Sequence, residues 1–256
     1  MDLGLQGRVA LITGGSTNIG AATAVAFGRE GARVALTYRH RAEAAEKVAR
    51  AVKEAGGRAM ALPYDLADDA SARRTVDAVL DRWGTLDVLV NNAASWEGPP
   101  PGPHSPPFGD GADWEPVLDA NLTGHLRLLH HALPRLRRSS AGRIVNVSSI
   151  VAARGAHGTT VLAAAKAGLH GATRSLAWEL GPDGVLVNVV MPGLVLDGKD
   201  EAERSGLPPQ LLQEVLRELP TGRLPLARHV ADTVVFLCSS ANGAITGEVV
   251  RVTGGA

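Results

Sequence analysis

Short β-type runs alternate with longer helical stretches along nearly the whole chain, and this alternation constrains the fold most. The expected strands are Val9–Thr13, Arg33–Tyr38, Ala59–Leu62, Asp87–Asn91, Arg143–Ser148, Leu186–Met191 and Val249–Val252. Several are continuous apolar runs, which are typical of strands covered on both faces. The helices expected between them span residues 19–30, 42–55, 69–82, 113–137, 160–180 and 229–239. We therefore expect one α/β domain over residues 1–256, a doubly wound parallel sheet with helices on both faces.

The composition excludes several classes of function. The chain has 26 Lys+Arg and 26 Asp+Glu, so it lacks the basic excess that nucleic-acid binding requires. Its one cysteine, Cys238, excludes an internal disulfide and a thiolate cluster, and His130–His131 has no nearby carboxylate pattern that suggests a metal. No apolar run reaches the roughly 18 residues that span a bilayer, and residues 1–8 do not resemble a signal peptide. We expect a soluble, cytoplasmic protein without metal, nucleic-acid partner or membrane contact.

A glycine-rich turn follows the first expected strand. The segment Thr13–Gly20 reads Thr-Gly-Gly-Ser-Thr-Asn-Ile-Gly and leads into a helix. Small residues at such a turn allow backbone amides to approach a pyrophosphate at the positive end of the helix. Asn18 replaces the middle glycine of the usual dinucleotide fingerprint, and asparagine tolerates a positive φ better than most residues. The pattern predicts a nucleotide-binding turn, with an ordinary tight turn as the alternative.

The end of the second expected strand bears on the choice of nucleotide. It reads Thr37-Tyr38-Arg39-His40-Arg41, without the carboxylate that would accept a hydrogen bond from a ribose 2′-hydroxyl. Arg39 and Arg41 are placed to pair with a 2′-phosphate, although either could be a solvated loop charge. The pattern favours NADP(H) over NAD(H).

Two segments interrupt the alternation. Residues 95–112 are rich in proline, and residues 194–220 are polar and contain a helical piece, Pro209–Leu219. Both follow strands, and loops that leave the carboxyl ends of parallel strands form the ligand crevice of such a sheet. We expect the first to be a substrate-side loop that includes Trp96, and the second to be a substrate lid. Solvated loops without a role are the alternative.

The motifs, taken together and in order, resemble the short-chain dehydrogenase/reductase family, most closely its 3-oxoacyl-carrier-protein reductase-like branch. The resemblance covers almost the whole chain. It is carried by Thr13–Gly20, Asp65-Leu66, Asn91-Asn92-Ala93-Ala94, Asn121-Leu122-Thr123-Gly124, Val147-Ser148-Ser149, Lys166-Ala167-Gly168, Pro192-Gly193, Thr246-Gly247 and Gly254-Gly255.

The resemblance implies a Rossmann-type fold, a nicotinamide cofactor and a homotetramer or homodimer. The implied cofactor residues are Gly14, Ser16, Thr17, Asn18, Ile19 and Gly20 at the pyrophosphate, Tyr38, Arg39, Asp65 and Leu66 around the adenosine, Asn92 and Ala93 along the cofactor, and Val195 at the carboxamide. Three catalytic residues are implied. Ser149 would donate a hydrogen bond to the substrate carbonyl, Asn121 would hold a relay water, and Lys166 would bind the ribose.

The sequence departs from the family at the expected proton donor. The family has a tyrosine four residues before the lysine, where this chain has Leu162. Ser149 lies at the family's usual thirteen residues before that position, so the alignment is secure. A positioned general acid contributes ~10²–10⁴-fold to a rate, so its loss weakens a reductase without eliminating it. Asp197, where the family often has threonine, puts anchoring of the carboxamide in doubt.

Three replacements for the missing acid are open. Water on an Asn121–Lys166 relay, His157, or a hydroxyl of the substrate itself could protonate the alkoxide, and we prefer the substrate hydroxyl. We therefore expect a ketoreductase of secondary metabolism acting on a polycyclic, aromatic or polyketide-like ketone. A protein of the same fold without redox activity, such as a cyclase, a dehydratase or a cofactor-bound partner subunit, is the alternative.

Overall fold

The computed structural model describes residues 2–95, 114–196 and 209–256, in which seven strands form one parallel sheet. The strand order is β3-β2-β1-β4-β5-β6-β7, so the chain winds outward in both directions from the middle of the sheet. The strands are β1 (Val9–Ile12), β2 (Arg33–Tyr38), β3 (Arg58–Pro63), β4 (Val88–Asn91), β5 (Arg143–Val147), β6 (Leu186–Pro192) and β7 (Val249–Val252). Each differs from the sequence prediction by at most one residue at either end, and the predicted doubly wound fold is confirmed.

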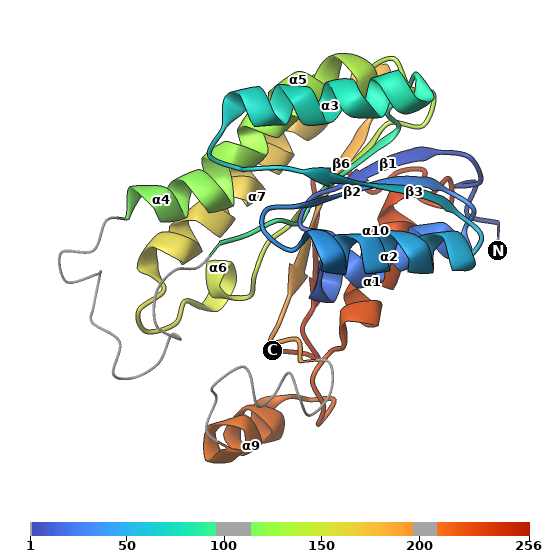
Figure 1. Ribbon diagram of the computed structural model, residues 1–256. Helices are drawn as coiled ribbons and strands as arrows, with labels where there is room; N and C mark the ends of the chain where they lie inside the picture. The colour runs from blue at the N-terminus through green and yellow to red at the C-terminus, as the bar shows by residue number, and fades with distance from the viewer. Residues whose placement is uncertain (1, 96–113, 197–208) are drawn as a thin grey trace.

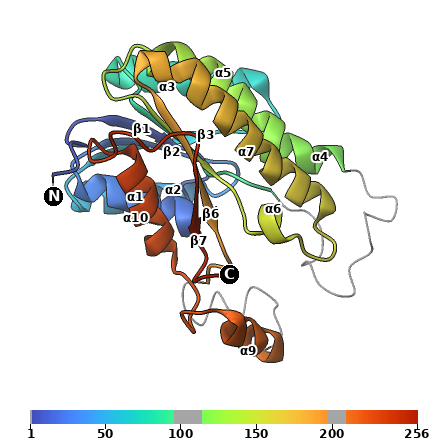
Figure 2. The ribbon, with the colours of Figure 1, turned by 180° about the vertical axis from the view of Figure 1, so that it is seen from behind.

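Helices cover both faces of the sheet (Figures 1 and 2). One layer contains α1 (Asn18–Arg29), α2 (Ala42–Glu54) and α10 (Ala227–Cys238), and the other contains α3 (Asp69–Trp83), α5 (Gly124–Leu136) and α7 (Thr160–Leu180). Shorter helices are α4 (Glu115–Leu118), α6 (Val151–Arg154) and α9 (Pro209–Glu218). Among the described residues, no helix is both long and apolar enough to cross a membrane.

The helix predicted over residues 113–137 is found over Glu115–Leu136, with one irregular turn inside it. The described part of this region is α4, a π-helical turn at Asp119–Thr123, and then α5. Asn121 explains the interruption, because its side-chain amide donates to the carbonyl oxygen of Val117 at 2.9 Å. That carbonyl lies four residues earlier and would accept the backbone N–H of Asn121 in a regular α-helix. The turn therefore widens, as π-helical turns near functional sites often do.

Two apolar cores explain why the strands are continuously hydrophobic. In β1, Ala10 and Ile12 pack in the core beneath α1, α2 and α10, whereas Val9 and Leu11 pack in the core beneath α3, α5 and α7. Phe27 of α1 is fully buried in the first core. Successive side chains point to opposite faces of a strand, so a sheet covered on both sides needs apolar residues at every position.

A buried polar chain connects the middle of the sheet to α7. The side-chain amide of Asn91 in β4 donates to Oδ1 of Asn146 in β5 at 2.9 Å. Nδ2 of Asn146 in turn donates to Oγ1 of Thr173 in α7, also at 2.9 Å. Because these groups are buried, losing one partner leaves another polar group without a hydrogen bond. The contact fixes α7 against β5.

We predict that Thr173→Val lowers the free energy of unfolding by about 1–3 kcal/mol, the cost of leaving the Asn146 amide unpaired at nearly constant side-chain volume. Urea unfolding followed by circular dichroism measures the change. Thr160→Val, at an exposed position of the same helix, is the matched control and should change stability by less than about 0.5 kcal/mol. Equal effects of the two substitutions would contradict the prediction.

Candidate active site

The predicted site residues gather at one edge of the sheet, because the carboxyl ends of parallel strands lie together there. The glycine-rich turn follows β1, Tyr38 and Arg39 end or follow β2, and Asp65 and Leu66 follow β3. Asn92 and Ala93 follow β4, Ser149 follows β5, and Val195 follows β6. Asn121 and Lys166 reach the same edge from the π-helical turn and from α7.

The turn after β1 has the shape of an anion cradle. Gly14 has a φ of +63°, and a Cβ at this residue would lie only 2.9 Å from the Cα of Ala93. Asn18 has a φ of +47°, as the sequence indicated, and it is the one non-glycine with positive φ among residues 2–95, 114–196 and 209–256. Helix α1 begins at Asn18 with no acidic residue in its first turn. The positive helix end therefore fits the pyrophosphate of a dinucleotide.

The ends of β1 and β4 are held together by Thr13, the first residue of the predicted glycine-rich turn. Its Oγ1 accepts hydrogen bonds from the backbone N–H groups of Asn92 and Ala93, both at 2.9 Å. The side-chain amide of Asn92 donates to the carbonyl oxygens of Thr13 at 2.9 Å and Gly14 at 3.2 Å. These bonds fix the path of the glycine turn relative to β4.

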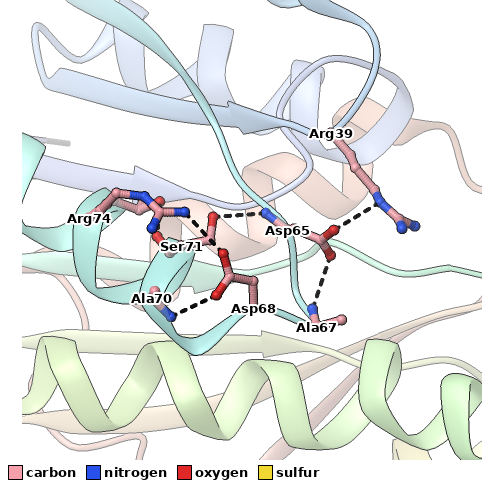
Figure 3. Close-up of polar contacts among 8 residues, drawn as sticks. Arg39, Asp65, Ala67, Asp68, Ala70, Ser71 and Arg74 are labelled. Carbon is pink, nitrogen blue, oxygen red and sulfur yellow. Dashed lines mark hydrogen bonds and ion pairs between the residues drawn. The ribbon is translucent and has the colours of Figure 1, made fainter.

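Two residues predicted near the adenosine form an ion pair that the sequence did not reveal (Figure 3). Nε of Arg39 lies 3.4 Å from Oδ2 of Asp65. The other carboxylate oxygen accepts the backbone N–H of Ala67 at 3.0 Å, and the backbone N–H of Asp65 donates to Ser71 at 3.1 Å. The contact brings the ends of β2 and β3 together. Both side chains are about half exposed, so the pair adds little stability.

Lys166 lies buried against the end of β5. Its Nζ donates to the carbonyl oxygen of Val147 at 3.2 Å, two residues before Ser149, and the residue is only 4% exposed. Burial disfavours the charged form and lowers the pKa of Lys166 to about 8. Ser149 is half-buried, and its Oγ accepts the backbone N–H of Val151 at 3.4 Å. The hydroxyl and the ammonium therefore both lie near the carboxyl end of β5.

Ser148 and His170 form a further contact that the sequence did not indicate. Oγ of Ser148 lies 2.7 Å from Nε2 of His170 and donates to the backbone carbonyl of Lys166 at 3.3 Å. This bond draws the lysine backbone toward β5. It therefore joins the Thr173 contact in holding α7 in place.

Leu162 lies one helical turn before Lys166 on α7, and residues four apart share one face of a helix. Its half-buried hydrocarbon has no proton to donate. The two tyrosines of the chain are held elsewhere: Tyr38 ends β2, and the Tyr64 hydroxyl donates to the carbonyl oxygen of Gly124 at 3.2 Å. Burial also raises the pKa of Tyr64. His157 is exposed on the loop between α6 and α7.

His125 is a buried residue of the site that the sequence reasoning missed. It is 1% exposed, and its Nε2–H donates to the carbonyl oxygen of Ala93 at 2.8 Å. Burial, together with the neighbouring Lys166 ammonium, lowers the pKa of His125 to about 3, so the imidazole is neutral. Its position four residues after Asn121, on the apolar face that includes Leu128 and Leu129, was the signal available in the sequence.

Several predicted pocket residues lie outside the described residues. They are Trp96, nearly all of the 95–112 loop, Asp197 and the first part of the 194–220 segment. Val195 is described and packs against the core beneath α1 and α10. The helical piece expected at Pro209–Leu219 is found as α9. Within the described ranges, no three His, Cys, Asp or Glu side chains cluster as metal ligands would.

Comparisons with known proteins agree with this architecture. The family described as Enoyl-(Acyl carrier protein) reductase matches residues 14–256. The chain is 34% identical over 248 residues to the 3-oxoacyl-[acyl-carrier-protein] reductase FabG of Staphylococcus aureus, covering 97% of each protein. It is 40% identical over 253 residues to the short-chain reductase protein NovJ of Streptomyces niveus, covering 98% of this chain and 94% of that protein.

A solved structure shows the same fold with a nucleotide bound. The NADH-dependent reductase A1-R′, crystallised with NAD, superposes with a TM-score of 0.83 at 30% identity, covering 98% of this chain and 97% of that chain. Sequence and structure agree over almost the full length. The chain therefore belongs to the short-chain dehydrogenase/reductase family, in its 3-oxoacyl-[acyl-carrier-protein] reductase-like branch.

Proposed function

We propose that the chain is an NAD(P)H-dependent ketoreductase whose proton source is not a tyrosine. One observation carries the proposal: Lys166 and Ser149 lie near the same strand end, at the sheet edge that bears the glycine-rich turn, and Leu162 lies one helical turn before Lys166. The family resemblance predicts the acid at the position of Leu162. The membership in a family of reductases supports it. When bound, the reduced nicotinamide supplies the hydride.

The residues have distinct roles in this proposal. The cradle of Gly14, Ser16–Gly20 and the start of α1 binds the pyrophosphate, and Asn92 and Ala93 line the path toward the nicotinamide. Tyr38, Arg39, Asp65 and Leu66 surround the adenosine, Val195 meets the carboxamide, and Lys166 binds the ribose. Asn121 supports a relay water. The Ser149 hydroxyl donates to the substrate carbonyl and stabilises the negative charge that develops on its oxygen.

The substrate we propose is an aromatic, polycyclic or polyketide-like ketone. Leu162 presents an apolar side chain on the same face of α7 as Lys166. An apolar side chain there favours a planar ring over a short aliphatic ketone, because contact with the ring removes more apolar surface from water. A hydroxyl group on the ring, next to the ketone, would also supply the proton that the alkoxide needs. A relative at 40% identity, named as the short-chain reductase protein NovJ of Streptomyces niveus, supports the reductase part of the proposal. A role in secondary metabolism is part of our proposal.

The absence of an acid at Leu162 also favours a second candidate function. A chain that binds the cofactor without a phenolic acid can act as a partner subunit, or as a cyclase or dehydratase that transfers no hydride. The two candidates differ in cofactor oxidation. A reductase consumes NADPH with some planar ketone, whereas the non-redox protein binds NADPH and leaves it reduced across a broad screen.

We also propose a homotetramer or homodimer located in the cytoplasm. Trp178 on α7 is 86% exposed, and Leu126 on the neighbouring layer helix α5 is exposed as well. Large apolar side chains exposed on long helices favour burial against another subunit.

Arg39→Ala should raise the Kd for NADPH by about 10–100-fold, because it removes hydrogen bonds from a charged donor to the 2′-phosphate. The Kd for NADH should change by less than about threefold. Fluorescence titration measures both constants. Arg50→Ala, at an exposed position of α2, is the control. If the Kd values for NADPH and NADH rose equally, Arg39 would not select between the two nucleotides.

Ser149→Ala should lower kcat by about 100-fold, the size expected for one lost donor to the oxyanion. Steady-state NADPH oxidation with a planar ketone measures the effect. Ser140→Ala, at an exposed position before β5, should leave kcat unchanged. Unchanged turnover in Ser149→Ala would exclude the hydroxyl from the reaction.

Leu162→Tyr should raise kcat for simple ketones without a hydroxyl by ~10²-fold or more, because it restores a positioned acid. Leu162→Phe provides the same ring without the proton and is the matched control. Both variants should bind NADPH as the parent does. If Leu162→Phe and Leu162→Tyr had the same kcat, the missing acid would not limit the rate with these ketones.

A further inference from the structure

The ring of His125 is buried and uses only one of its two nitrogens. The residue is 1% exposed, and its Nε2–H donates to the carbonyl oxygen of Ala93 at 2.8 Å. The other ring nitrogen, Nδ1, has no hydrogen-bond partner in the described parts of the chain. A buried acceptor without a hydrogen bond costs free energy that an aliphatic side chain would not cost. The contact with Ala93 is therefore what this histidine contributes.

Two different elements hold Ala93, one at each of its peptide groups. Its N–H donates to Oγ1 of Thr13, directly after β1, at 2.9 Å, and its carbonyl oxygen accepts from His125 on α5. The Cα of Ala93 lies only 2.9 Å from the place where a Cβ on Gly14 would be. Ala93 therefore packs directly against the glycine-rich turn, and a change in its orientation would alter the crevice beside that turn.

A second side chain of the same helical region holds the next part of this segment. Nδ2 of Asn121, four residues before His125, donates to the carbonyl oxygen of Ser95 at 2.7 Å. Ala93 and Ser95 are half-buried and Ala94 between them is exposed, which is the two-residue alternation of an extended chain. Two donors one helical turn apart thus hold two carbonyls that are two residues apart.

The segment lies on the other side of the glycine-rich turn from the predicted adenosine residues. In the strand order β3-β2-β1-β4, Tyr38 ends β2 and Asp65 follows β3, whereas Ala93 follows β4. A dinucleotide binds across the crevice of such a sheet, with its pyrophosphate at the turn after the first strand. We therefore expect the adenosine half at the ends of β2 and β3, and the nicotinamide half at the end of β4.

We propose that His125 is a positioning residue for the nicotinamide half of the cofactor, and that it acts through the Ala93 carbonyl. The inference rests on the proposed function of a nucleotide-binding reductase. The imidazole holds the Ala93 peptide in one orientation before the cofactor arrives. A site that is already ordered loses less conformational freedom on binding, and hydride transfer requires the reacting groups in a fixed geometry.

Two amide substitutions separate this contact from the polarity of the side chain. The amide nitrogen of glutamine can reach about the position of Nε2, so His125→Gln keeps a donor to Ala93. The amide of asparagine ends near the position of Nδ1, so His125→Asn keeps a polar side chain and loses the contact. His130→Asn, at an exposed position of the same helix, is the matched control.

The binding test compares a whole cofactor with its adenosine half by isothermal titration calorimetry. His125→Asn should raise the Kd for NADPH about tenfold, which corresponds to about 1.4 kcal/mol and is the size expected for one buried hydrogen bond. The Kd for 2′,5′-ADP should change by less than about twofold, because this ligand binds at a distant part of the crevice. NADH and ADP form the corresponding pair without the 2′-phosphate. His125→Gln should restore the affinity for NADPH, and His130→Asn should match the parent.

Other patterns of binding would overturn the proposal. Equal losses for NADPH and 2′,5′-ADP in His125→Asn would indicate a general disturbance of the fold. NADPH binding unchanged in His125→Asn, or a loss in His125→Gln as large as in His125→Asn, would mean that the Ala93 contact does not serve the cofactor.

A second measurement reads the contact in the unaltered protein. A carbonyl oxygen can only accept, so the proposal requires the proton of His125 on Nε2. NMR of protein labelled with ¹⁵N in its eight histidines shows the tautomer of each ring, and His125→Gln identifies the signals of His125. We expect the Nε2–H tautomer, with a signal that shifts when NADPH binds and not when 2′,5′-ADP binds. A proton on Nδ1, or a signal that does not respond to NADPH, would contradict the positioning role.

The outcomes separate this inference from the proposed function. If the parent binds and oxidises NADPH and His125→Asn does so with the same Kd, the reductase stands and the positioning role is excluded. If the parent binds neither NADPH nor NADH, the proposed function is wrong, and the positioning role with it.

Discussion

Helix α7 is fixed to strand β5 by three buried polar contacts, and the geometry of the site depends on them. Thr173 accepts from Asn146, the Lys166 carbonyl accepts from Ser148, and the Lys166 ammonium donates to Val147. These bonds fix the rotation of α7 about its own axis and therefore the direction in which its Leu162 face points. A helix held less firmly would leave the separation between Lys166 and Ser149 free to vary, and catalytic groups act through fixed geometry.

In the proposed reaction, the source of the proton rather than the source of the hydride distinguishes this site. The glycine-rich turn, the Thr13–Asn92 hydrogen bonds and the Arg39–Asp65 pair lie at the sheet edge where we propose that the nucleotide binds. Leu162 lies one helical turn before the buried Lys166, and within the described ranges Oδ1 of Asn121 and Nδ1 of His125 have no hydrogen-bond partner. Such a surplus of buried polar atoms is costly unless something uses it.

The strands, the layers and the conformation of Asn18 could be predicted from the sequence, because apolar periodicity and turn chemistry are local. The π-helical turn could not, since it arises when the Asn121 side chain takes a carbonyl that the backbone would otherwise use. His125 escaped prediction for a similar reason: its hydrogen-bond partner, the carbonyl oxygen of Ala93, lies in a distant segment that only the fold brings beside it. The Arg39–Asp65 pair joins two strand ends that are distant in the chain. The sequence analysis placed each residue near the adenosine but did not predict the contact between them.

The central claim is that this chain passes a hydride to a ketone without a tyrosine. Mass spectrometry of the product formed with NADPH deuterated at both C4 positions and a planar hydroxyaryl ketone tests it directly. The account predicts one deuterium on the carbinol carbon for each NADPH oxidised. Product without deuterium, or protein that binds neither NADPH nor NADH, would contradict it.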